Sequence, residues 1–123
     1  MRAHAGTAPV AAVLVAVVAG CGSGTTHPTI AHASASRGRA AIEYYGCGSC
    51  HMIGGIATAD GHVGPPLTNF SDRQSIAGKL PNTTHALEQW IQHPQQIVPG
   101  TIMPDLGVTK AQARDIAAYL DSQ

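Results

Sequence analysis

Residues 47–51 read Cys47-Gly48-Ser49-Cys50-His51, a C-x-x-C-H pentapeptide, and the interpretation of the whole chain starts from this stretch. Two thiols at this spacing can add to the two vinyl groups of one porphyrin, and the histidine that follows is carried beneath the iron as an axial ligand. The pentapeptide therefore predicts one covalently attached haem c, held by Cys47, Cys50 and His51.

Other meanings of a C-x-x-C pair fit this sequence less well. A structural zinc site needs about four ligands, and with three cysteines in the whole chain no second pair completes a Cys-rich site. A thioredoxin-like dithiol is typical of a βαβ unit, whereas the residues after His51 are rich in glycine and proline. A dithiol oxidoreductase stays as an alternative; it would show two titratable thiols and no bound pigment.

The first twenty residues have the pattern of an export signal. Arg2 and His4 give a short basic start, an apolar run extends from Val10 to Ala19, and small residues follow. The run is about ten residues long, whereas a membrane-spanning helix needs roughly twenty. Residues 1–20 are therefore predicted to be a signal peptide, which places the mature chain in the periplasm or on the outer face of the cytoplasmic membrane.

The end of this signal, Val18-Ala19-Gly20-Cys21, resembles the bacterial lipobox, although the family usually has leucine where Val18 stands. The resemblance implies cleavage before a cysteine that carries a diacylglyceryl group, so Cys21 is predicted to be lipidated and to hold the chain on a membrane surface. Lipidation also gives a role to the odd cysteine, since two are used for haem. An ordinary cleavage site with an incidental cysteine is the alternative.

Residues 21–37 are predicted to be the lipidated cysteine followed by a flexible linker. The segment 22–36 is made of small and polar residues with almost nothing bulky, so it cannot bury enough apolar surface to order itself. The remaining residues, 38–123, form one small domain with few aromatic side chains. A covalent haem would add buried apolar surface to a domain that has little of its own, so we expect the haem-free chain to be poorly folded.

Two helices are predicted on either side of the glycine-rich middle of the domain. Ser36 can cap a first helix that extends to Tyr45 and leads into the haem motif. Thr83 or Thr84 can begin a second, amphipathic helix that Pro94 ends. His85 and His93 both lie in this second segment, where histidines are more often surface residues than ligands.

The last helix has the clearest signals. Thr109 and Gln112 form a capping box, and the residues that follow place an apolar face toward the first helix. A short helix near residues 73–79 is also possible. Because no strand-like alternation is present, the fold class is predicted to be all-α, with three to four helices around one haem.

The second axial ligand decides the chemistry of the iron. Met103 lies in segment 99–104, Pro-Gly-Thr-Ile-Met-Pro, which two prolines and a glycine keep out of helix, as suits a loop over the far face of the haem. A thioether favours ferrous iron and raises the reduction potential relative to a second histidine. Met52 directly follows the motif and is held on the near side, whereas His93 and His62 remain as alternative ligands.

The early C-x-x-C-H, the Met-Pro loop and the capped terminal helix together resemble a class I monohaem cytochrome c. The likeness covers residues 38–123, and we expect the domain to stand alone behind the lipoprotein-like signal peptide. Five further segments are similar to the haem-c domain fused to subunit II of some haem-copper oxidases: Leu80-Pro81-Asn82-Thr83, Trp90-Ile91, Pro94-Gln95, Pro99-Gly100 and Met103-Pro104.

The resemblance also implies roles for three residues outside the motif. Pro65 stands where the family has a backbone carbonyl that accepts the Nδ1 hydrogen of the proximal histidine. Trp90 and Arg73 stand at positions resembling those that donate hydrogen bonds to the haem propionates. Core packing for Trp90 and a solvated surface position for Arg73 are the alternatives.

Charge restricts the classes of partner. Residues 40–123 carry seven acidic and four basic side chains, so the domain is mildly acidic, which argues against nucleic acid. It also lacks the lysine-rich docking face associated with mitochondrial cytochromes c, and we expect docking to depend on an apolar rim around the haem edge.

The predicted function is one-electron transfer outside the cytoplasmic membrane. With His51 and Met103 filling both axial positions, no site is left for a small-molecule substrate, so the protein is predicted to be a carrier and not an enzyme. Its partners would be redox proteins, a respiratory oxidase or dehydrogenase, together with the membrane surface through the lipid. The alternatives are an electron-accepting subunit of such a complex, or a haem enzyme or sensor if the sixth ligand is labile.

Overall fold

The computed structural model describes residues 1–2 and 32–123. The predicted signal peptide, the lipidation of Cys21 and most of the predicted linker lie outside the described residues, and these stay predictions. Within the described residues, no helix combines the length and the apolar composition needed to cross a membrane.

Helices dominate the described fold, which confirms the predicted all-α class. In chain order they are α1 (Ala35–Tyr44), α2 (Thr84–Gln92), α3 (Pro94–Ile97) and α4 (Lys110–Asp121). Two single turns of 3-10 helix occur in the loops, η1 (Cys47–Ser49) and η2 (Phe70–Asp72).

The short helix expected near residues 73–79 is wrong, because the chain forms a small hairpin there. Strand β1 (Ser75–Ile76) pairs antiparallel with β2 (Leu80–Pro81). Ala77 and Gly78 between them both have positive φ, 51° and 65°, which is incompatible with a right-handed helix and typical of a type I′ turn.

Side-chain caps fix the beginnings of three helices. The Thr109 and Gln112 capping box of α4 is present as predicted, and Thr83 caps α2 by accepting from the N–H of Ala86. Helix α1 begins earlier than expected, and Ser34 caps it instead of Ser36. The extended backbone of Ser34 lets its hydroxyl accept a hydrogen bond from the backbone N–H of Arg37.

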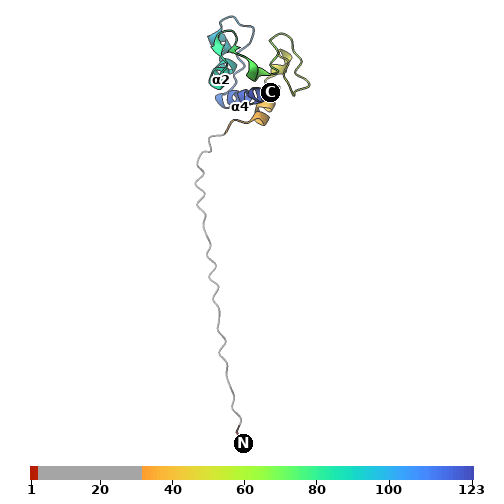
Figure 1. Cartoon of the computed structure of the whole chain (residues 1–123), viewed down its shortest axis with the longest axis vertical. Helices are drawn as coiled ribbons and strands as arrows, with labels where there is room; N and C mark the ends of the chain where they lie inside the picture. The colour runs from red at the N-terminus through yellow and green to blue at the C-terminus, as the bar shows by residue number, and fades with distance from the viewer. Residues whose placement is uncertain (3–31) are drawn as a thin grey trace.

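The terminal helices pack directly against each other, as predicted from the apolar face of α4. Figure 1 shows α4, drawn in blue, between α2 and the orange α1. Gly38 makes the close approach possible, because a Cβ there would overlap the backbone carbonyl of Asp115. The buried core of these three helices includes Ile42, Leu87, Ile91, Ile116 and Leu120.

A buried carboxylate joins the first described residues of the domain to α4. Asp115, 11% exposed at its side chain, accepts from Ser34 N at 2.8 Å and from Arg37 Nε and Nη2 at 2.8 and 2.9 Å. This bidentate contact is the strongest geometry for a hydrogen-bonded pair of a guanidinium and a carboxylate. The hydrogen bond from Arg37 lowers the pKa of the Asp115 carboxyl, and the Ser34 N–H adds to this effect, while burial opposes it.

The lowered pKa of Asp115 gives the stability a defined pH dependence. Because the folded pKa lies below the unfolded value of about 3.9, the stabilisation is present above that pH and is lost as the pH falls through the folded pKa. Asp115→Asn should therefore lower the melting temperature at pH 7, and the gap to the parent protein should close in acid. Thermal melts between pH 7 and pH 2 check this.

A matched control is Glu43→Gln, which removes an exposed carboxylate whose Arg39 partner lies 3.3 Å away on the same helix. Exposed pairs of this kind contribute little, so this variant should melt close to the parent protein. An equal loss in both variants, or a gap for Asp115→Asn that stays constant down to pH 2, would contradict the assigned role of Asp115.

Candidate functional site

The C-x-x-C-H motif lies directly after α1 and begins as the 3-10 turn η1. The following loop is bonded to the motif at two points: Gly61 N donates to Gly48 O at 3.0 Å, and Gly64 N donates to Cys50 O at 2.8 Å. The loop is thereby held against the motif, and it brings residues 64 and 65 beside the histidine.

The orientation of His51 is fixed by this loop. His51 Nδ1 lies 2.7 Å from the carbonyl oxygen of Pro65, and because a carbonyl can only accept, Nδ1 carries the hydrogen and donates it. The lone pair of Nε2 is then free to bind a metal. Gly64 packs so closely against the imidazole that a Cβ would overlap its Cε1.

A cavity of about 380 Å³ opens in front of the motif. Its walls are mostly apolar and come from helices and loops that are far apart in the sequence. The main wall residues are Ile42, Leu87, Ile91, Ile116 and Leu120 from the helices, with Ile53, Leu67, Phe70, Val98 and Val108 from the loops. A concave apolar chamber with a few polar groups is typical of a cofactor site.

The structure brings every residue proposed for the cofactor site to this one cavity. These residues are Cys47, Cys50, His51, Pro65, Arg73, Trp90 and Met103. Cys21, predicted to carry lipid, lies outside the described residues.

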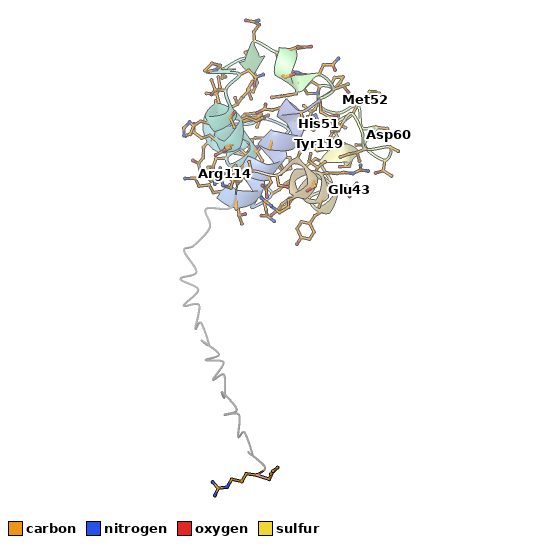
Figure 2. The ribbon with its side chains drawn as sticks, turned by 60° about the horizontal axis from the view of Figure 1, so that its bottom comes forward. Glu43, His51, Met52, Asp60, Arg114 and Tyr119 are labelled. Carbon is orange, nitrogen blue, oxygen red and sulfur yellow. The ribbon has the colours of Figure 1, made fainter. Side chains whose placement is uncertain are left out.

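The competing ligands are placed elsewhere. Met103 is the methionine and His51 the histidine among the lining residues, whereas His62, His85 and His93 are exposed and do not line the cavity. Met52 is also absent from the lining; it pairs with Asp60 in an isolated bridge, and Figure 2 shows the two at the edge of the folded part. Among the described residues, the geometry therefore favours Met103 over each alternative.

Arg73 and Trp90 also lie in the wall of the cavity. The Arg73 guanidinium donates to the backbone carbonyl of Pro66 and lies over the Phe70 ring, 5.4 Å from its centroid. Trp90 is partly buried against the core. Both can supply N–H donors to an anionic group in the cavity, and neither is fully solvated.

The donor set fits a haem and does not fit a bare metal ion. Across residues 1–2 and 32–123, no three His, Cys, Asp or Glu side chains converge into a group that could hold a metal by themselves. An iron here would need the four nitrogens of a porphyrin between one imidazole and one thioether. The apolar walls and the two thiols beside them suit that macrocycle.

The Cys47 thiol does not have the character of a redox-active cysteine. Burial raises the pKa of the Cys47 thiol, and a backbone hydrogen bond opposes this shift only in part. Reactive dithiols have a lowered pKa, because the thiolate is the nucleophile. The dithiol oxidoreductase alternative is therefore disfavoured.

Sequence reasoning missed Gln95, whose side chain reaches the loop that carries Met103. Its Nε2 donates to the carbonyl oxygens of Thr101 and Met103, each at 2.7 Å. The sequence analysis placed Gln95 in a segment similar to the oxidase-fused haem-c domains but gave it no role, and its contact with the loop is found only from the structure.

Comparisons with known proteins give a family match and a similar protein. The family model for cytochrome c matches residues 35–123. A similar protein, cytochrome c oxidase subunit 2 of Alkalihalophilus pseudofirmus, is 39% identical over 89 residues, which is 72% of this chain and 25% of that protein. The chain thus spans about a quarter of the length of this relative. No solved structure gave a significant match.

Proposed function

Because the chain belongs to the cytochrome c family, it binds haem c covalently and transfers electrons, and we propose that His51 and Met103 are its two axial ligands. We further propose that the protein works between respiratory partners on the outer side of the cytoplasmic membrane. The single observation that carries this proposal is that His51 and Met103 line the same apolar cavity while the competing histidines are exposed.

Each residue of the site has a defined task in this function. When bound, the haem iron supplies a one-electron couple between the ferric and ferrous states. Cys47 and Cys50 would hold the macrocycle through their thiols, His51 would present Nε2 with Pro65 keeping its ring in place, and Met103 would supply its thioether from the cavity wall. The apolar walls exclude water, which keeps other ligands away from the metal.

Trp90 and Arg73 are proposed to donate N–H groups to the propionates. This role is supported by their place in the cavity wall and by the N–H groups that both side chains carry. Their donors would offset the cost of holding carboxylates beside an apolar chamber.

The place outside the membrane is supported by the export pattern of the first twenty residues and by the lipobox-like Cys21. The same sequence supports attachment to the membrane surface through lipid. The similar protein is named as a subunit of an oxidase, and this favours a second candidate: a permanent electron-accepting subunit of such a complex. The two candidates use the same site and differ in how long the partner stays bound.

A spectrum of the exported protein tests the proposal. A pyridine haemochrome should report one covalent haem per chain, and the oxidised protein should show the weak far-red band of a methionine bound to ferric iron. The reduced protein should bind carbon monoxide slowly, because both axial positions are filled. Covalent haem without the far-red band, combined with rapid carbon monoxide binding, would instead indicate a haem enzyme or sensor.

An apolar rim at the mouth of the cavity is the proposed docking face for redox partners. Ile102, Val63 and Leu106 line the cavity and are also 77%, 59% and 40% exposed. Large apolar side chains at such exposure mark contact surfaces when they gather around one opening.

Docking through this rim should make electron transfer almost independent of salt. Raising the ionic strength from low to high should change the rate to a purified haem-copper oxidase by less than about threefold, whereas charge-steered partners change by tenfold or more. Ile102→Ser should slow the reaction, and Tyr44→Ser, at an equally exposed position away from the cavity, should not. A steep fall of the rate with salt would contradict the apolar docking face.

A further inference from the structure

The segment 98–108, here called the methionine loop, has few connections to the rest of the fold. It forms no helix or strand. In the part of the chain that the structure describes, Val98 N donates to Pro94 O, and every other hydrogen bond between this loop and a residue outside it comes from Gln95.

Gln95 reaches the loop from the second position of α3. Its side-chain Nε2 donates to Thr101 O and to Met103 O, both at 2.7 Å, and these contacts are partly buried. Its backbone N–H also points at Asp105 Oδ1, at 3.4 Å. One residue thus contacts the loop before, at and after Met103.

The chemistry of a primary amide suits this task. An NH₂ group has two hydrogens, so it can donate to two carbonyl oxygens at the same time. Methionine, in contrast, has a flexible side chain, and its thioether is a weak, neutral ligand. The position of the Met103 sulfur therefore depends on where the backbone of the loop is held.

We propose that Gln95 is a positioning residue that holds the methionine loop closed and so determines how often Met103 leaves the iron. This inference rests on the proposed function, in which Met103 is the sixth ligand. It goes further, because it assigns the lability of that ligand to one side chain outside the cavity lining.

The test compares two variants of the holoprotein. Gln95→Glu keeps the shape of the side chain but replaces the NH₂ donors with an acceptor, which then faces two carbonyl oxygens. Gln96→Glu introduces the same charge on the neighbouring residue of α3, which is exposed and has no hydrogen bond to the loop among the described residues. Differences between the two variants therefore report on the donors and not on the charge.

The expected result has three parts. Gln95→Glu should bind carbon monoxide on the order of tenfold faster than the parent protein, because loss of both donors raises the population with Met103 detached. It should also lose much of the far-red methionine band and have a lower reduction potential. Gln96→Glu should match the parent in all three measurements.

The possible failures are distinguishable. A parent protein without the far-red band refutes Met103 as the ligand, and with it the proposed function. If the parent protein has the band and Gln95→Glu behaves like Gln96→Glu, only the role of Gln95 is refuted.

If Gln95→Glu does not accumulate as holoprotein, Gln95→Leu is the second variant, because it removes the donors without adding charge. A leucine variant with parent-like carbon monoxide binding would also overturn the proposal. If neither Gln95→Glu nor Gln95→Leu accumulates as holoprotein while Gln96→Glu does, Gln95 is required for folding, and the proposed role in positioning Met103 is overturned.

Discussion

Met103→Ala should lower the reduction potential by on the order of 100 mV, a fraction of the roughly 0.8 V that axial ligands span. The thioether stabilises ferrous iron, so its loss favours the ferric state. Because no other methionine or histidine of the described residues lines the far wall, the sixth position should then be open, and the ferrous variant should bind carbon monoxide rapidly. Redox titration and flash photolysis measure the two effects.

Met52→Ala is the matched control for this experiment. Met52 lies beside the motif in the sequence but outside the cavity lining, so its removal should leave the potential and the far-red band unchanged. An unchanged spectrum and potential in Met103→Ala would remove Met103 from the ligand set. Loss of the band in Met52→Ala would indicate that Met52 is the ligand.

The haem-free chain, made as the Cys47→Ala/Cys50→Ala double variant, should show no cooperative thermal transition. Empty volume in a core costs about 24 cal/mol per Å³, so a cavity of 380 Å³ corresponds to at most about 9 kcal/mol, an upper figure because the mouth opens to solvent. A domain of this size has a stability of about 5–15 kcal/mol in total. Without the cofactor, the walls from α1, α2 and α4 have nothing to pack against.

Circular dichroism during heating, with and without covalent haem, checks this expectation. Ser49→Ala keeps both thiols and lies between them, so it should attach haem and melt cooperatively like the parent protein. A sharp, cooperative melt of the haem-free double variant would show that the helical core is sufficient by itself.

The local signals in the sequence predicted the helices better than the hairpin. The capping box of Thr109 and Gln112 and the cap at Thr83 depend on residues three positions apart, so the pattern determines them. The turn at Ala77 and Gly78 was missed because alanine rarely adopts positive φ, and Gly78 alone marks a turn only weakly when no Asn, Asp or Pro stands beside it. Ser34 instead of Ser36 as the cap of α1 depends on Asp115, 81 residues away, which holds the Ser34 N–H.

The residues of the site were predictable where chemistry restricts the residue type. A motif of two thiols and an imidazole, and a methionine between prolines, stand out in any sequence. The residues that complete the chamber do not: Leu67, Val98 and Val108 are ordinary apolar residues that only the fold brings together. Gln95 belongs to the same class, because its amide can hold the loop only where the fold places its Nε2 within reach of the carbonyl oxygens of Thr101 and Met103.

The contact of Gly64 and Pro65 with His51 has a consequence for the speed of electron transfer. The imidazole is held between a carbonyl acceptor at one nitrogen and a backbone without a side chain against its ring. As the proposed ligand, an imidazole fixed in this way would have little freedom to tilt or retreat when the charge on the metal changes. Groups that are already in place need to move little during a reaction. The part of the electron-transfer barrier that comes from movement of the histidine should therefore be small, both when the haem is oxidised and when it is reduced.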